Sequence, residues 1–319
     1  MQRLDRLMND TRAWPADAGL ETCMIYDDGL DLPHFASFVL LDTEAGRAAL
    51  TRYFARYIAL AVQGGTGFVL DTATWRANMG WAARMGMDAA AIRRANLRAV
   101  DFASELRKAH ETGELPIIIN GVVGPSGDGY RIDATLTAES AEALHREQVD
   151  ALAEAGVDLV SALTMTHPGE AIGIARAARR AGLPHVLSFT LETDGRLPNG
   201  QGLHEGLAEV EAATGGSALF YMVNCAHPAH FARDLDGPMR ARIGGIRANA
   251  SRLSHAELDL ATELDDGDPE DFGHFYAAFA RFLPNLRLVG GCCGSDHRHV
   301  GAACGHLHAA GRRGHDVAT

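Results

Sequence analysis

Short apolar segments alternate with longer, alanine-rich segments of helical periodicity along almost the whole chain, and this alternation limits its fold more than any other feature. Such a pattern is typical of parallel strands joined by crossover helices. Strands buried on both faces of a parallel sheet are apolar throughout, as these segments are. Eight segments are predicted to be strands: Leu20–Ile25, Gly67–Leu70, Pro116–Val123, Val157–Leu163, His185–Leu191, Ala218–Val223, Arg242–Ala248 and Arg287–Val289. Seven are predicted to be helices: Gly46–Gln63, Asp88–Glu111, Thr137–Ala155, Gly169–Ala181, Leu203–Thr214, Pro269–Leu283 and Asp296–Ala310.

Eight strands in 319 residues favour a (β/α)8 TIM barrel over an open doubly wound sheet. A doubly wound sheet that binds a dinucleotide usually carries a Gly-x-Gly-x-x-Gly turn after its first strand, and this chain has none there. No low-complexity linker divides the chain, and no repeat beyond the strand–helix alternation is visible. We therefore expect an α/β fold, a TIM barrel, with a single domain over residues 1–319.

Charge and hydropathy exclude several kinds of partner. The chain has 41 acidic and 29 basic residues and a formal net charge of −12, which repels nucleic acids and anionic membranes. No run of 18 apolar residues predicts a membrane span, and the N-terminal residues lack the apolar core of a signal peptide. We expect a cytoplasmic protein with small-molecule partners, no nucleic acid and no membrane. A homo-oligomer is compatible with this sequence.

Three of the five cysteines lie where strands of the predicted barrel end. Cys225 follows one apolar strand, and Cys292 and Cys293 lie between glycines after the last one. Because the C-terminal ends of barrel strands share one face, we expect these thiols to meet. The flanking glycines permit the backbone to bend around an ion. Three thiolate ligands leave a fourth position open, as in a catalytic zinc site. Cys23 and Cys304 are predicted to be ordinary buried thiols.

The ligand type constrains the reaction. Three thiolates and Zn²⁺ give a net charge of about −1, so the ion is a weak Lewis acid and is poorly suited to activating water. Such a site instead suits a substrate thiol, which binds as its thiolate with release of a proton. The sequence therefore predicts alkylation of a zinc-bound substrate thiolate, with no separate protein nucleophile. Two alternatives stay open: a zinc metallohydrolase, and a non-catalytic protein that stores zinc or senses thiol oxidation.

The cysteine motifs resemble those of the zinc-dependent homocysteine S-methyltransferase family. Asn224-Cys225 and the Gly-Gly-Cys-Cys-Gly segment that starts at Gly290 carry the resemblance, which extends from Asp17 to Ser295. It implies a TIM-barrel enzyme that methylates a thiol, by default homocysteine, giving methionine. The implied donor is a small sulfonium or ammonium compound of the S-methylmethionine or betaine type, because 319 residues leave no room for folate or cobalamin domains.

The resemblance also implies substrate-binding residues at the mouth of the barrel. Asp17 would hold the ammonium group of the amino-acid acceptor at the entrance to the first strand. Glu21 and Thr22 would face the mouth. Asn224 would orient the site, and Asn249 would contact the acceptor.

One position departs from the family's pattern. Members commonly carry a glutamate after the fourth strand that binds the amino group of homocysteine, and this chain has Leu163 there. A leucine cannot pair with an ammonium ion. Either Glu21 or Glu192 supplies the missing carboxylate, or the acceptor is not homocysteine. Trp75 and Tyr221 are predicted candidates to stabilise a cationic donor through their aromatic rings.

Overall fold

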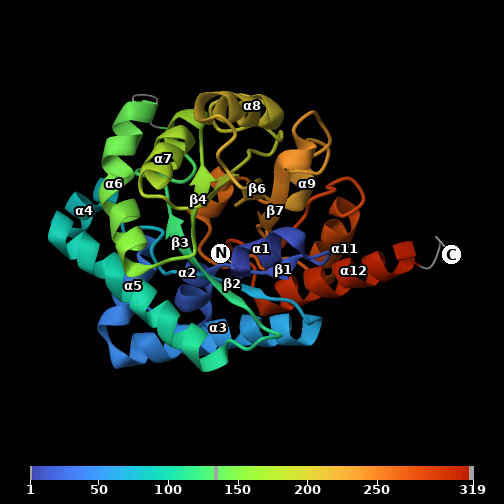
Figure 1. Ribbon diagram of the computed structural model, residues 1–319, viewed down its shortest axis with the longest axis horizontal. Coiled ribbons are helices and arrows are strands. Elements are labelled where there is room, and N and C mark those ends of the chain that lie inside the picture. Colours follow the sequence, from blue (N-terminus) through green and yellow to red (C-terminus); the bar gives the residue numbers. More distant parts are fainter. Residues whose placement is uncertain (1, 133–135, 316–319) are drawn as a thin grey trace.

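The computed structural model describes residues 2–132 and 136–315. Eight parallel strands form one sheet in the order β1-β8-β7-β6-β5-β4-β3-β2, which curls until β1 approaches β2, and helices surround it (Figure 1). The strands are β1 (Trp14–Pro15), β2 (Phe68–Asp71), β3 (Ile117–Val123), β4 (Leu159–Met165), β5 (His185–Phe189), β6 (Tyr221–Asn224), β7 (Ile243–Ala248) and β8 (Leu288–Gly291). The prediction of a TIM barrel is confirmed, and seven of the predicted strands overlap β2 to β8.

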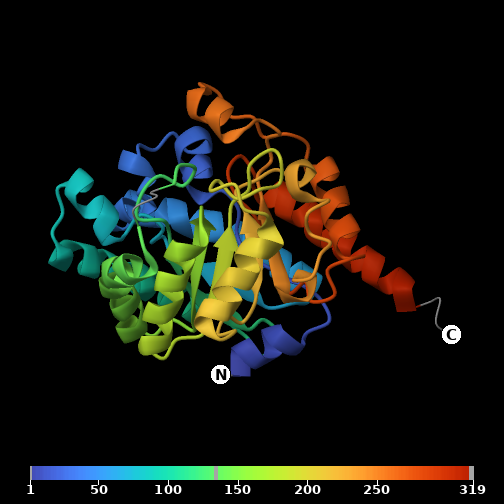
Figure 2. The ribbon, with the colours of Figure 1, turned by 90° about the horizontal axis from the view of Figure 1, so that it is seen from above.

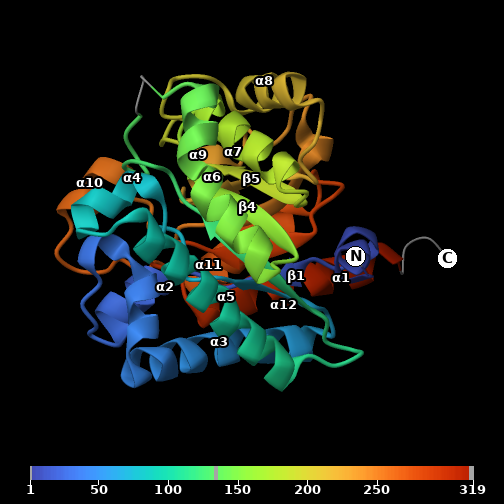
Figure 3. The same ribbon diagram turned by 60° about the vertical axis from the view of Figure 1, so that its left-hand side comes forward.

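Helices cover the outside of the sheet, and neighbours such as α6 and α7 pack side by side (Figure 3). The helices are α1 (Gln2–Asn9), α2 (Leu20–Thr22), α3 (Glu44–Gly64), α4 (Met79–Ala82), α5 (Ala89–His110), α6 (Ala138–Ala155), α7 (Pro168–Arg180), α8 (Leu203–Thr214), α9 (Pro228–Phe231), α10 (His255–Leu260), α11 (Pro269–Phe279) and α12 (His297–His315). Each predicted helix overlaps one of these. Within the described ranges, none combines the length and apolarity needed to cross a bilayer.

Side chains of the strands alternate between two cores. On β3, Ile118 and Val122 belong to the cluster inside the barrel, whereas Ile117, Ile119 and Val123 pack outward against the helices. This is the two-residue period of a strand whose faces are both buried. Helix α1 adds Leu7 to the interior cluster, and it lies at the opposite end of the barrel from α10 (Figure 2). One end of the barrel is therefore plugged, and the other carries the loops that follow the strands.

The predicted first strand, Leu20–Ile25, is wrong. These residues form α2 and a π-helical turn, Cys23–Asp27, and the first strand lies earlier, at β1. Leu20 and Met24 are buried four residues apart, while Glu21 between them is only half-buried. That spacing is helical, and an apolar run this short is ambiguous from sequence alone.

Strand β1 closes the barrel although it is only two residues long. On one side its backbone pairs with β8: the Trp14 N–H donates to the Arg287 carbonyl at 2.7 Å, and the Ala16 N–H to the Val289 carbonyl at 2.8 Å. On the other side, no backbone ladder joins β1 to β2 within the described residues. The indole of Trp14 fills this seam by packing on Gly67, where an added Cβ would lie 2.2 Å from the ring.

A methyl group at Gly67 is therefore expected to disrupt the seam. Gly67→Ala should lower the free energy of unfolding by roughly 1–3 kcal/mol, because the indole cannot move without opening the core. Gly305→Ala is the matched control: this exposed α12 glycine has nothing within 4 Å of an added Cβ. It should raise stability by roughly 0.5–1 kcal/mol. Urea unfolding followed by circular dichroism would measure both, and a neutral Gly67→Ala would contradict this account of the seam.

Candidate active site

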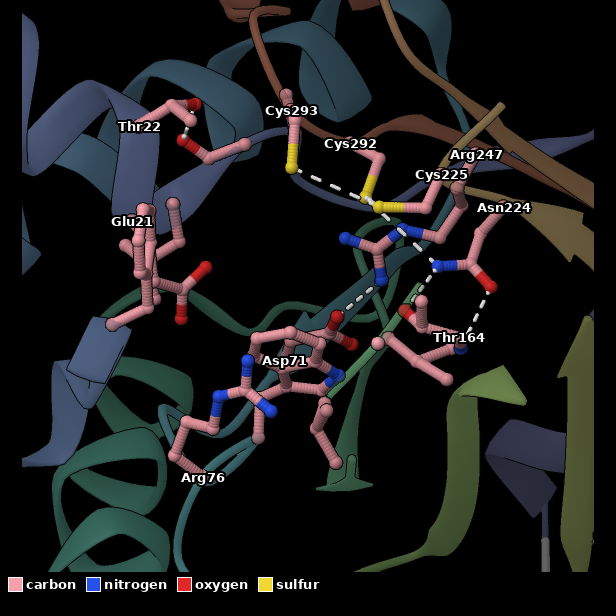
Figure 4. A pocket seen from close by; sticks show the side chains of 18 of the residues that line it. Glu21, Thr22, Asp71, Arg76, Thr164, Asn224, Cys225, Arg247, Cys292 and Cys293 are labelled. Atoms are coloured by element: carbon pink, nitrogen blue, oxygen red, sulfur yellow. Dashed lines mark hydrogen bonds and ion pairs between the residues drawn. The ribbon is translucent and has the colours of Figure 1, made fainter. Parts of the chain in front are cut away.

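The three predicted ligands meet at the open end of the barrel. Cys225 follows β6, and Cys292 and Cys293 follow β8, with their three Sγ atoms within 4.8 Å of one another (Figure 4). The Cys225 sulfur lies 3.7 Å from that of Cys293 and 2.7 Å from that of Cys292. Two sulfurs on one tetrahedral zinc are roughly 3.8 Å apart, so the first pair has ligand spacing and the second would open by about 1 Å. Among the side chains that the structure describes, no other group of His, Cys, Asp or Glu residues gathers closely enough to hold an ion.

The backbone of Cys225 is held in an unusual conformation. Its φ of 58° lies in the left-handed region, which costs a non-glycine residue of order 1–3 kcal/mol. Hydrogen bonds hold it there. The Cys225 N–H donates to the Arg247 carbonyl at 3.1 Å. The Cys225 carbonyl accepts from His255 Nε2 at 2.7 Å and from Thr190 Oγ1 at 3.1 Å. This turn at the end of β6 directs the thiol toward β8.

The amide of Asn224 links β4, β5 and β6 and approaches the loop after β8. Its Oδ1 accepts from the Thr164 N–H at 2.9 Å and from Ser188 Oγ at 2.6 Å. Its Nδ2 donates to Thr164 Oγ1 at 2.9 Å and lies 3.9 Å from the Cys292 sulfur (Figure 4). Thr164 also has a left-handed backbone, with φ 65°. Asn224 therefore lies beside the sulfurs with its amide fixed by hydrogen bonds, and the orienting role that the resemblance implies for it stays a prediction.

The cysteine loop packs closely on the segment after β1. A Cβ at Gly290 would lie 2.6 Å from the Asp17 carbonyl oxygen, and Gly294 has a φ of 76°, so both positions require glycine. Thr22 Oγ1 accepts from the Gly294 N–H at 3.3 Å and donates to the Gly19 carbonyl at 3.0 Å. Thr22 lines the mouth, as predicted, but its hydroxyl is already bound within the chain.

A pocket of about 390 Å³ lies beside the sulfurs. Leu163 and Val122 form an apolar part of its wall, and Glu21, Arg76 and Asp128 contribute charged groups. The lining therefore has a leucine where the family's glutamate was expected and carboxylates elsewhere.

Three residues predicted to bind substrate or donor lie outside this pocket. Glu192 and Asn249 line a separate, smaller depression, and Glu192 Oε1 lies 3.4 Å from Nδ1 of His255. The prediction for Tyr221 is wrong. Its side chain points outward from β6 into the helical layer, where its hydroxyl donates to Glu211 at 2.6 Å. Alternate residues of a strand face opposite sides, and the sequence does not show which side Tyr221 takes.

Arg247 on β7 is buried between two carboxylates, which the sequence did not predict. Its guanidinium pairs with Asp71 (Figure 4) and with Asp17, and all three side chains are almost inaccessible. Tyr53 donates to Asp17 at 3.2 Å, and Asn120 donates to Asp71 at 2.7 Å. Burial raises the pKa of Asp17, and the charge of Arg247 opposes that rise by stabilising the carboxylate. Asp17 follows β1 rather than lying at the entrance to a strand. Its carboxylate is already paired with Arg247 within the chain.

Two further residues near the sulfurs, Tyr130 and His255, were not predicted from the sequence. The Tyr130 hydroxyl lies 3.7 Å from the Cys293 sulfur and 3.8 Å from the Cys225 sulfur. Its ring stacks on His255, with centroids 3.9 Å apart and planes 16° from parallel. Tyr130 lies in a loop and His255 is the first residue of the short helix α10, and no periodicity marks either position. The glycine-rich stretch before Tyr130 is the one available signal of a close approach.

Comparisons with known proteins agree with this geometry. The family model for homocysteine S-methyltransferase matches residues 16–307. A homocysteine S-methyltransferase from Escherichia coli (strain K12) is 26% identical over 250 residues, covering 70% of this chain and 74% of that protein. The fold resembles crystal structures of the E. coli homocysteine methyltransferase MmuM. Its oxidized form gives a TM-score of 0.73 at 22% identity, covering 94% of this chain and 98% of that one. Its metallated form gives a TM-score of 0.72 at 22% identity, covering 96% of this chain and 99% of that one.

The family model spans most of the chain, including both cysteine motifs. The prediction of a thiol S-methyltransferase is thereby confirmed, and a metallohydrolase or redox sensor is not favoured. The chain belongs to the homocysteine S-methyltransferase family.

Proposed function

We propose that this enzyme transfers a methyl group from a small sulfonium or ammonium donor, of the S-methylmethionine or betaine type, to the thiol of homocysteine, giving methionine. The proposal depends most on one observation: three thiols converge beside a pocket of about 390 Å³, a volume suited to amino-acid-sized molecules. We further propose that Cys225, Cys292 and Cys293 hold Zn²⁺. Thiolate ligands select soft ions, and zinc is the one that brings no redox chemistry to a transfer that needs none.

When bound, zinc supplies an open position at which the acceptor thiol is held as a thiolate. The surrounding residues orient and shield that position. Tyr130 places its hydroxyl against two of the sulfurs and can donate to a thiolate there. The Tyr130 ring stacks on His255, and His255 is hydrogen-bonded to the Cys225 carbonyl. These two contacts fix the position of the Tyr130 hydroxyl relative to Cys225. Positioning of donor and acceptor in line then lowers the barrier to transfer.

Glu21 is the best-placed carboxylate for the ammonium group of the acceptor. It lines the pocket, is half-buried, and accepts a hydrogen bond from Ser37 at 2.8 Å, which leaves further lone pairs free. Asp17 is occupied by Arg247, and Glu192 lies outside the pocket. Leu163 then contacts the methylene groups of the substrate rather than its charge. Position 163 can therefore be apolar in an enzyme that still accepts homocysteine.

The charge of the site suits a cationic donor. Glu21 and Asp128 line the pocket, and three thiolates around a divalent ion add a net charge of about −1. Trp75 also lines the pocket, but the Arg76 guanidinium lies 3.9 Å from its ring centroid and occupies one face. We therefore assign attraction of the donor mainly to the carboxylates.

Loss of one thiolate should abolish both metal binding and transfer. Cys225→Ser and Cys293→Ser should each lower methyl transfer by more than about 100-fold, because loss of a direct ligand exceeds the effect of losing its supporting hydrogen bonds. Cys304→Ala is the matched control, since Cys304 is buried in α12 away from the site. Metal content per chain and turnover should be measured together. Near-normal zinc and turnover in either serine variant would refute the ligand assignment.

Glu21→Gln should weaken homocysteine binding, with KM rising roughly 10- to 100-fold, because a buried charge-assisted hydrogen bond is lost. Glu192→Gln should leave KM within about twofold, because its carboxylate lies outside the pocket. A thiol without the amino group, 4-mercaptobutyrate, should be used equally well by Glu21→Gln and the wild type. If Glu192→Gln raised KM and Glu21→Gln did not, the ammonium site would have to be reassigned.

A further inference from the structure

Arg76 presents a buried guanidinium to the pocket without an ion-pair partner. It follows β2, is 8% exposed, and lines the pocket. Its Nη1 donates to the Gly127 carbonyl at 3.0 Å, whereas its Nε is buried and has no hydrogen-bond partner. Across the part of the chain that the structure describes, no carboxylate comes within ion-pair distance of it; Glu21 and Asp128 act on it only from farther away.

A second buried arginine lines the same pocket and has the ion-pair partners that Arg76 lacks. Arg247 is equally inaccessible, but it has both Asp17 and Asp71 as partners. The protein neutralises Arg247 and leaves Arg76 without such a partner. Burial lowers the pKa of Arg76 to about 10, which reflects the cost of an unpaired charge in this place. An anion that entered the pocket would relieve that cost.

The orientation of the Arg76 guanidinium is also fixed before any such anion binds. It is sandwiched between two indole rings, 3.9 Å from the centroid of Trp75 and 3.8 Å from that of Trp81. Trp81 is fixed by a hydrogen bond of 3.1 Å from its Nε1 to the Pro125 carbonyl. The Trp75 carbonyl accepts from the Gly124 N–H at 3.1 Å. Because both faces of the guanidinium are stacked, a ligand can bind only along its N–H edge. The N–H groups on that edge have the spacing to donate to the two oxygens of a carboxylate.

We propose that Arg76 binds the α-carboxylate of an amino-acid substrate, while Glu21 binds its ammonium group. This inference rests on the proposed function, which makes the pocket the substrate site. Figure 4 shows Glu21 and Arg76 on the same side of the sulfurs, and no ion pair joins them among the described residues. A zwitterion placed between them would satisfy both charges. The receptor would therefore come from the segments after β1 and β2 instead of from the end of β4, where Leu163 lies.

The test compares zinc-loaded wild type with Arg76→Gln. Calorimetric titration gives Kd for homocysteine and for 3-mercaptopropylamine, the same thiol without its carboxylate, and kinetics gives KM for S-methylmethionine. We expect Arg76→Gln to raise Kd for homocysteine or KM for S-methylmethionine roughly 10- to 100-fold and to leave 3-mercaptopropylamine unchanged. A rise for homocysteine identifies the acceptor's carboxylate, and a rise for S-methylmethionine identifies the donor's.

Arg84→Gln is the matched control. Arg84 is exposed, stacks on Trp81 at 4.4 Å and does not line the pocket, so all three constants should stay within about twofold. Arg76→Lys, which keeps the charge but not the planar fork, should fall between wild type and Arg76→Gln. Unchanged constants in Arg76→Gln, or equal weakening of the thiols with and without a carboxylate, would overturn the assignment. A wild type that methylates no thiol would instead contradict the proposed function.

Discussion

The buried pairing of Arg247 with Asp17 and Asp71 joins parts of the barrel that backbone hydrogen bonds leave apart. Asp17 follows β1 and Asp71 ends β2, so the guanidinium bridges the seam where no ladder links these strands in the described residues. The same residue also reaches both ligand loops. Its carbonyl accepts from the Cys225 N–H, and its Nε donates to the Gly291 carbonyl at 3.3 Å. Closure of the fold and placement of the thiols therefore depend on one side chain and its backbone.

This arrangement bears on how the pocket beside the sulfurs differs from the family's pattern. A carboxylate bound to a buried guanidinium is a poor receptor for a substrate ammonium, because that pairing would have to be shared. Asp17 and Asp71 are paired with Arg247, and Leu163 is apolar. Among the described residues of the lining, this leaves Glu21, Arg76 and Asp128 as acidic or basic side chains without an ion-pair partner. These charges lie around the pocket rather than at its apolar wall. If Glu21 and Arg76 bind the amino acid as we propose, its recognition lies at a different part of the barrel mouth while the three thiols stay in place.

Much of this architecture could be predicted because it follows from periodicity and from the geometry of strand ends. Cys225 and Cys292 are far apart in sequence, yet parallel strands bring them to one face, as expected. The prediction of a strand at Leu20–Ile25 was wrong because a short apolar run fits a helical turn equally well. Tyr130, His255 and Arg76 could not be predicted, since their positions depend on loops, or on the start of the short helix α10, whose conformations no pattern encodes. Such residues become visible only when distances are known.

X-ray absorption at the zinc edge, on protein isolated under reducing conditions, tests the central claim most directly. The account predicts one zinc per chain with three sulfur neighbours near 2.3 Å and one lighter neighbour, and a fourth sulfur after homocysteine is added. Protein without zinc, or zinc whose sulfur count stays the same when homocysteine is added, would contradict it.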